Sequence, residues 1–107
     1  MKKIEIIELP KIYDPRGSLT VAEENTHIPF DIKRMEWIHL GAIQPETPME
    51  LGESPVMLIA LAGEITIQIM EEGTLKLTRP NQALILREAC KSSIIDSTEH
   101  SLLLTIH

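Results

Sequence analysis

The chain has 107 residues, the usual size of one domain, and is 43% hydrophobic, which supplies a core and excludes a disordered or fibrous chain. Sixteen acidic residues against ten basic residues give a formal charge of -6, which opposes binding to nucleic acid and to anionic membranes. We therefore expect a single globular domain over residues 1–107, with no nucleic-acid partner and no membrane partner.

The first half of the chain predicts short strands separated by turns. A β-branched run from Lys3 to Leu9 ends at a proline and predicts an edge strand. The turn sequence Asp14-Pro15-Arg16-Gly17 has the residue order of a type I turn and leads into a strand at 18–23. Ile32, Arg34, Glu36 and Ile38 alternate with Lys33, Met35, Trp37 and His39, and we predict a strand that ends at Leu40. Segment 41–55 holds three prolines and two glycines, and we expect a long loop there.

The second half of the chain predicts six further strands, at 56–61, 65–69, 74–78, 83–86, 93–96 and 101–106. A turn at Glu71-Glu72-Gly73 joins the second of these strands to the third. Ile65, Ile67 and Ile69 alternate with polar residues, so we expect these three side chains to face the core. About nine short strands with no amphipathic helix indicate an all-β fold, either a sandwich or a barrel.

Two blocks in the first half resemble a known family. D-P-R-G-S-L-T at 14–20 and I-P-F-D-I-K-R at 28–34 are similar, in order and in separation, to the opening of the dTDP-sugar 3,4-ketoisomerases of the cupin superfamily. The resemblance implies a cupin-type double-stranded β-helix, or jelly roll, that forms a homodimer. It also implies a thymidine-diphosphate 4-keto-6-deoxy sugar as ligand, a place in deoxysugar biosynthesis, and no metal or organic cofactor.

The resemblance also shows a gap in this sequence, because the family's R-G-x-H-A-H block has no counterpart. When the chain is aligned on Gly63, the H-A-H positions fall near Met49-Glu50-Leu51, and a further family histidine falls near Ser92. The family histidines are thought to move a proton between adjacent sugar carbons, for which imidazole is suited and methionine or leucine is not. Glu50 is a weak candidate for a replacement base, and a solvated loop carboxylate is the alternative.

Four other side chains are candidates for ligand binding. Arg16 is placed to pair with phosphate or to stabilise its own turn. Arg34 and Lys33 face opposite ways on one strand, so one of them faces the barrel interior, and a solvated ion pair is the alternative. Trp37 either stacks on a base or sugar or belongs to the core. His39, on the same face as Trp37, is either a weak catalytic candidate and ligand contact or a rim histidine with one hydrogen bond.

The histidines and the cysteine define the remaining expectations. None of the four histidines forms an H-x-H pair, and we predict no metal site. The single cysteine, Cys90, excludes an internal disulfide and is typical of a reducing compartment. Glu5 and Glu8 interrupt the apolar stretch that a signal peptide needs, so we expect a cytoplasmic protein.

Three functional hypotheses follow. The first is a ketoisomerase-like cupin with impaired catalysis that keeps dTDP-sugar binding or a structural role. The second is an active sugar isomerase or epimerase with a rearranged centre drawn from Arg16, Glu36, His39 or Glu50. The third is a non-catalytic dimeric interaction module. An open, polar cavity favours the first two hypotheses, and a cavity filled by the side chains Met35, Met49 and Leu51 favours the third.

Overall fold

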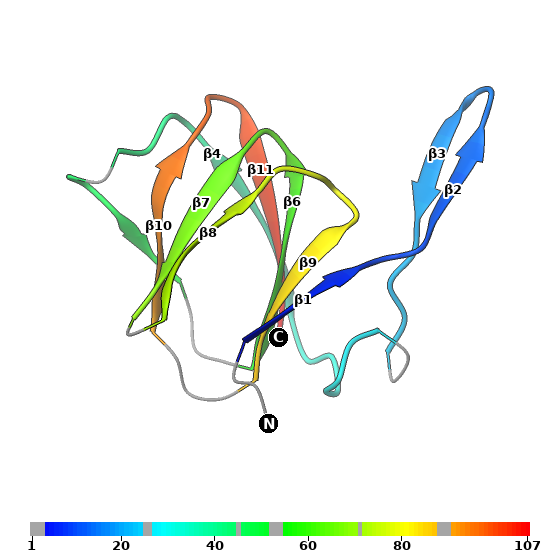
Figure 1. The fold of residues 1–107 in the computed structure, drawn as a ribbon, viewed down its shortest axis with the longest axis horizontal. Helices are drawn as coiled ribbons and strands as arrows, with labels where there is room; N and C mark the ends of the chain where they lie inside the picture. The colour runs from blue at the N-terminus through cyan, green and yellow to red at the C-terminus, as the bar shows by residue number, and fades with distance from the viewer. Residues whose placement is uncertain (1–3, 25–26, 45, 52–54, 71, 88–90) are drawn as a thin grey trace.

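The computed structural model describes residues 4–24, 27–44, 46–51, 55–70, 72–87 and 91–107. Strands are the regular secondary structure of these residues, as the all-β prediction required (Figure 1). They are β1 (Ile4–Glu8), β2 (Lys11–Asp14), β3 (Gly17–Thr20), β4 (Met35–Leu40), β5 (Met49–Glu50), β6 (Val56–Ala62), β7 (Ile65–Ile69), β8 (Gly73–Leu77), β9 (Gln82–Leu86), β10 (Ser92–Ser97) and β11 (Ser101–Ile106). No helix in the described part of the chain is long and apolar enough to span a membrane.

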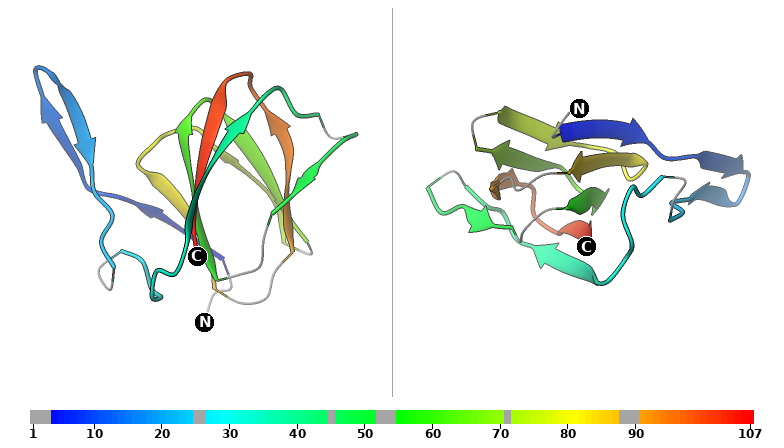
Figure 2. Two further views of the ribbon diagram at one scale, coloured as in Figure 1. Left: turned by 180° about the vertical axis from the view of Figure 1, so that it is seen from behind. Right: turned by 90° about the horizontal axis from the view of Figure 1, so that it is seen from below.

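Two antiparallel sheets face each other. The larger sheet has the strand order β1-β9-β6-β11-β4, and the smaller has the order β5-β10-β7-β8 (Figures 1 and 2). Strand β1 is an edge of the larger sheet, as predicted. Strands β2 and β3 form a separate hairpin that projects away from both sheets and extends the longest dimension of the molecule, which measures 41 × 33 × 22 Å.

The main core lies between the two sheets and is aliphatic. Ile65, Ile67 and Ile69 on β7 are at most 2% exposed, which confirms the predicted inward face of that strand. Opposite them lie alternate residues of the larger sheet, such as Leu58 on β6 and Leu103 on β11. The two-residue period of each strand therefore fixes which side chains point between the sheets.

A second apolar cluster covers the outer face of the larger sheet. Met57, Ile59 and Ile85 point away from the main core and pack with Ile28 from the segment that follows the hairpin. Strand β6 is therefore buried on both faces, which explains why its sequence is a continuous apolar run rather than an alternating one.

Four details differ from the sequence-based expectation. Strand β2 was not predicted, and it forms because it pairs with β3 across the predicted turn at 14–17. Strand β3 ends at Thr20, and β4 begins at Met35 rather than at Ile32, whose side chain instead packs on the second apolar cluster. Strand β5 lies inside the expected loop because Met49 and Glu50 pair with β10. Cys90 and Glu71 lie outside the described residues.

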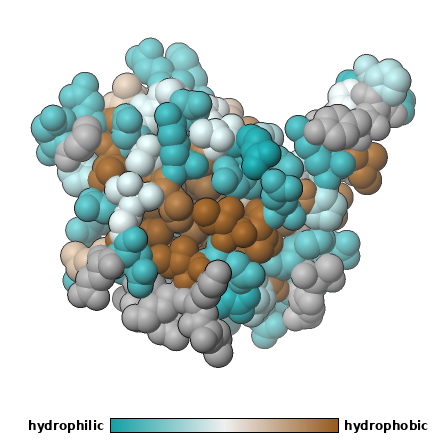
Figure 3. Space-filling view, in the orientation of Figure 1, coloured by the Kyte–Doolittle hydropathy of each residue, from teal (hydrophilic) through white to brown (hydrophobic). Residues whose placement is uncertain are grey.

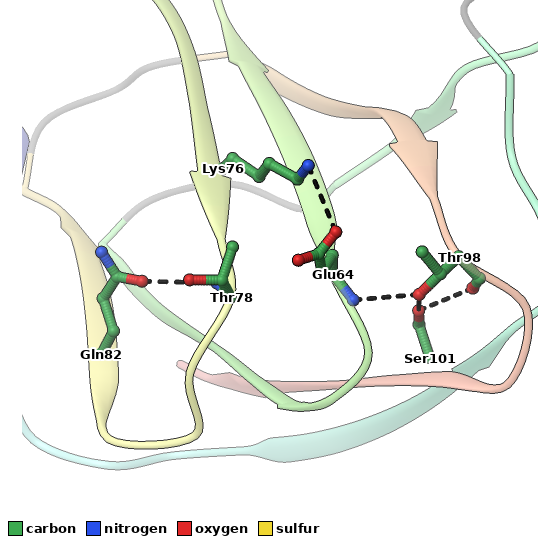
Figure 4. Close-up of polar contacts among 6 residues, drawn as sticks. All are labelled: Glu64, Lys76, Thr78, Gln82, Thr98 and Ser101. Atoms are coloured by element: carbon green, nitrogen blue, oxygen red, sulfur yellow. Dashed lines mark hydrogen bonds and ion pairs between the residues drawn. The ribbon is translucent and has the colours of Figure 1, made fainter.

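One end of the sandwich is closed by two turns that hydrogen-bond to each other (Figure 4). The backbone N–H of Glu64 donates to Oγ1 of Thr98 at 3.0 Å, and that atom lies 2.8 Å from Oγ of Ser101. Gly63 has φ +74°, and a Cβ there would overlap the Ser101 hydroxyl. The turn after β6 therefore requires glycine both for its conformation and for the close approach of the β10–β11 turn.

Candidate functional site

A cavity of about 240 Å³ lies at the other end of the sandwich, where β4 and β6 begin and β11 ends. Part of its lining is apolar and comes from Ile38, Leu51, Val56 and Leu58. The rest is polar and comes from Arg34, Glu36, Glu50, Thr105 and His107. A hollow with apolar walls and a few convergent polar groups is the usual form of a small-molecule site.

Strand alternation places the polar groups of the larger sheet in this cavity. Glu36 and Ile38 share the inner face of β4, and their register partners on β11 are Thr105 and Leu103. The backbone of His107 continues this ladder, because its N–H donates to the carbonyl of Arg34 at 2.7 Å and its carbonyl accepts from the N–H of Arg34 at 3.0 Å. The positions of these side chains are thus set by main-chain hydrogen bonds.

The polar groups from β4 and β11 converge on one carboxylate oxygen. Oε1 of Glu36 lies 3.2 Å from Nε2 of His107 and 3.5 Å from Nη2 of Arg34, and it accepts a 3.4 Å hydrogen bond from Oγ1 of Thr105. Nε2 of His107 also lies 3.2 Å from Oγ1 of Thr105. The His107 side chain is 14% exposed, whereas that of Glu36 is 47% exposed. An anion, a cation, a hydroxyl and an imidazole are therefore within reach of one ligand.

The structure brings three of the sequence candidates, Arg34, Glu36 and Glu50, to this cavity. Arg34 lines it, so of the pair Lys33 and Arg34 it is the arginine that reaches the interior. Glu50 lines it from β5, on a different sheet from Glu36. Of the three side chains considered as a plug, Leu51 lines the cavity, whereas Met35 and Met49 are exposed. The cavity is open, and its lining is partly apolar and partly polar.

The other candidates lie elsewhere. Arg16 is in the turn of the projecting hairpin, at the far end of the molecule from the cavity. Trp37 and His39 alternate with Glu36 and Ile38, so they lie on the outer face of β4. The expectation of a core position for Trp37 was wrong: it is 57% exposed, because β4 is an edge strand and the second apolar cluster does not include its outer face.

The sequence analysis missed His107 as a member of the site. The available signal was the two-residue period of the last strand, which puts Thr105 and His107 on the same side as Leu103. The pairing of this strand with β4, which sets Glu36 opposite Thr105, is a long-range contact that the local pattern does not encode.

The positions aligned with the family histidines are neighbours in the structure. The N–H of Leu51 donates to the carbonyl of Ser92 at 3.0 Å, which joins the end of β5 to the start of β10. Ser92 is 5% exposed, and its Oγ has no hydrogen-bond partner among the described residues. Unpaired buried hydroxyls are uncommon because they lose their hydration without compensation.

A second hollow, of about 320 Å³, lies against β1 on the outer face of the larger sheet. Its arginine, Arg87, is bound to the carboxylate of Glu5 at 2.5 Å, so the charges there compensate each other. Within the described ranges no three side chains of His, Cys, Asp or Glu are placed to hold a metal ion.

Two comparisons of the sequence with known proteins agree on the kind of protein that it resembles. The sequence model of the family described as FdtA (WxcM-like, C-terminal) matches residues 2–107. A 34-residue stretch is 53% identical to the TDP-4-oxo-6-deoxy-alpha-D-glucose-3,4-oxoisomerase of Aneurinibacillus thermoaerophilus. That stretch is 32% of this chain and 24% of the length of the relative.

Solved structures share the fold over almost the whole chain. A 3,4-ketoisomerase from Helicobacter canadensis superposes with a TM-score of 0.85 at 24% identity, covering 99% of this chain and 83% of that one. A variant of the 3,4-ketoisomerase QdtA from Thermoanaerobacterium thermosaccharolyticum, in complex with TDP-4-keto-6-deoxyglucose, gives 0.83 at 27% identity, with 99% and 80% covered. The TDP-quinovose 3,4-ketoisomerase WlaRB from Campylobacter jejuni gives 0.81 at 27% identity, with 99% and 85% covered. The expected cupin-type jelly roll is thereby confirmed.

Proposed function

The chain belongs to the FdtA family (WxcM-like, C-terminal), and from that premise we propose that its cavity binds a dTDP-linked 4-keto-6-deoxy sugar in deoxysugar biosynthesis, while histidine-dependent 3,4-ketoisomerisation is impaired. The observation that carries the proposal is the lining of the cavity. It is open and holds Arg34, Glu36 and His107, yet Leu51 lines it near the position where the family resemblance implies an imidazole.

The size of the cavity supports binding of the sugar part of such a ligand. Its volume of about 240 Å³ is slightly below the ~300–1,000 Å³ of typical ligand pockets, so a single sugar ring fits better than a complete sugar nucleotide. The nucleotide would then extend from the mouth, where the half-exposed guanidinium of Arg34 is the nearest cationic group of the lining. Guanidinium groups bind phosphate oxygens strongly because they offer paired donors.

The proposed impairment rests on the chemistry of three side chains. Ketoisomerisation needs a group that removes a proton beside the ketone and a group that delivers one to the next carbon. Met49, Leu51 and Ser92 do neither at neutral pH.

We also propose that the protein is a cytoplasmic homodimer. Its support is the exposed edge β1, whose Ile6 is 43% exposed, and the projecting hairpin, whose Ile12 is 56% exposed. Figure 3 shows hydrophobic side chains across the middle of one face, between β8 and the β1–β9 pair. A second copy covering these elements would remove the edge.

Ligand binding is tested by thermal unfolding with dTDP, with dTDP-4-keto-6-deoxyglucose and, as a mismatched control, with uridine-diphosphate glucose. A ligand at 100 times its dissociation constant adds about 2.7 kcal/mol. For a domain of this size that raises the melting temperature by roughly 10–20 °C. We expect a shift with both thymidine ligands. No shift with either would overturn the proposal and favour the interaction-module hypothesis.

A further inference from the structure

We propose that Glu36 and His107 form a carboxylate–imidazole pair that exchanges a proton with the carbon next to the ketone of a sugar bound in the cavity. The inference rests on the proposed function, because that function supplies the ligand. It places proton-transfer chemistry on β4 and after β11, across the cavity from the β5–β10 positions that the family alignment indicates.

The contacts of Glu36 assign it the role of base. His107, Thr105 and Arg34 all contact the same oxygen, Oε1, and a carboxylate has about four acceptor sites on its two oxygens. Glu36 therefore keeps the capacity to accept a proton from a ligand. Its side chain is about half exposed while His107 is mostly buried behind it, so Glu36 is the group that meets the sugar.

His107 holds the Glu36 carboxylate in place. Its Nε2 lies 3.2 Å from the Glu36 oxygen, within reach of a ring N–H hydrogen bond. The 3.2 Å contact between Nε2 and the Thr105 hydroxyl fixes the orientation of the ring. Thr105 itself is buried on β11, directly opposite Glu36 in register. Glu36 is thus the catalytic residue of the proposal, and His107 is a positioning residue.

The proposed step balances without any co-reactant. The C–H bond at C-3 of the 4-keto sugar breaks, its proton passes to the Glu36 carboxylate, and its electron pair forms the C-3–C-4 double bond as negative charge moves to the ketone oxygen. The half-exposed Glu36 carboxyl then gives this proton to water, and a solvent proton returns to C-3 through the same carboxyl group. The net change is exchange of one hydrogen with water.

This step differs from ketoisomerisation, which must also deliver a proton to C-4. The other carboxylate of the lining, Glu50, comes from β5 on the other sheet, and β6 contributes the apolar side chains of Val56 and Leu58. We therefore expect exchange at C-3 without accumulation of the 3-keto sugar.

The test is NMR of dTDP-4-keto-6-deoxyglucose in deuterated water with the full chain, with a protein-free sample as background. We expect the wild type to accelerate loss of the C-3 proton signal. Glu36→Gln should lower the exchange rate by at least about 100-fold, the lower part of the range for a general base, and should leave the ligand-induced thermal shift in place. Glu64→Gln, at an exposed ion pair with Lys76, and His100→Asn, in an exposed turn, are matched controls that should exchange as the wild type does.

A pair of variants separates positioning of Glu36 from structural support. His107→Gln keeps a side-chain N–H donor near the Glu36 oxygen, so it should retain part of the exchange rate. His107→Ala removes the donor and should exchange more slowly, while its ligand-induced thermal shift stays in place. Equal exchange rates in the wild type and in His107→Ala would contradict the role given to His107.

Three results would overturn the inference. They are a wild type that binds the ligand without exchanging it, a Glu36→Gln variant that exchanges at the wild-type rate, and loss of exchange in Glu50→Gln but not in Glu36→Gln. Each of these leaves ligand binding intact. Absence of any thermal shift in the wild type would instead overturn the proposed function itself, so the two failures are distinguishable.

Discussion

Nε2 of His107 lies 3.2 Å from Oε1 of Glu36, and the two side chains reach each other because their strands are paired. The register sets Glu36 opposite Thr105, and the backbone of His107 bonds to that of Arg34. Main-chain hydrogen bonds therefore hold the cavity wall, and the polar side chains are carried on it. The polar side chains of the cavity can therefore be substituted without breaking the main-chain hydrogen bonds that hold the sheet together.

Substitution of either partner should accordingly leave the fold intact. Glu36→Gln should change the free energy of unfolding by less than about 1 kcal/mol, because a half-exposed carboxylate contributes roughly 0–1 kcal/mol through its ion pairs. His107→Gln should leave the main-chain pairing of His107 with Arg34 in place. Urea unfolding followed by circular dichroism measures this. A loss of several kcal/mol in either variant would show that the pair supports the fold rather than a ligand.

The aliphatic core between the sheets predicts a large effect at β7. Ile67 is fully buried in the main cluster, so Ile67→Ala should cost roughly 2–5 kcal/mol of unfolding free energy through lost burial and a residual cavity. Gln68→Ala, on the exposed face of the same strand, is the matched control and should be close to neutral. Equal effects of the two substitutions would contradict the observed strand register.

The turn at Gly63 predicts a second specific loss of stability. Gly63→Ala places a side chain at φ +74° and against the hydroxyls of Thr98 and Ser101 (Figure 4), so it should cost at least about 1–3 kcal/mol. At Gly41 an added Cβ meets open space, so Gly41→Ala should be neutral or slightly stabilising. The thermal midpoints of the two variants provide the comparison, and similar midpoints would show that the two turns do not pack as described.

Two serines on β10, Ser92 and Ser97, differ in the hydrogen bonding of their hydroxyl groups and can be compared directly. Oγ of Ser97 donates to the carbonyl of Gly41 at 2.7 Å and accepts from the N–H of Ile43 at 3.1 Å, so Ser97→Ala should cost roughly 1–3 kcal/mol. The buried Oγ of Ser92 lacks a partner among the described residues, so Ser92→Ala should be neutral or stabilising. Chemical denaturation of both variants checks this, and the reverse order would mean that the Ser92 hydroxyl is satisfied.

Local sequence patterns predicted the features of the fold that depend on a single strand or a single turn. The alternation at Ile65–Ile69 set an inward face, and the D-P-R-G turn at 14–17 formed a hairpin. The two strands that were missed, β2 and β5, are short, and their formation depends on a paired neighbour. Pairing between distant segments carries no local signal.

The difference between local pattern and strand pairing also explains which residues of the candidate site were predicted. Arg34 was predicted as a ligand contact from its strand, and the structure places it at the cavity. Trp37 was expected in the core because a lone tryptophan usually is, but its strand is at the sheet edge. His107 was missed because its role depends on a register across two strands that are far apart in the sequence.

The central claim is that this chain keeps the ligand cavity of its family and has lost the ketoisomerisation that the family histidines perform. The most direct test is an isomerisation assay on dTDP-4-keto-6-deoxyglucose at saturating concentration, with NMR detection of the 3-keto product and with binding verified on the same preparation. General acid–base groups each contribute about 10²–10⁴ to a rate, so replacement by Met49, Leu51 and Ser92 predicts no 3-keto product above the protein-free background. Formation of the 3-keto sugar at a rate proportional to protein concentration would contradict the account.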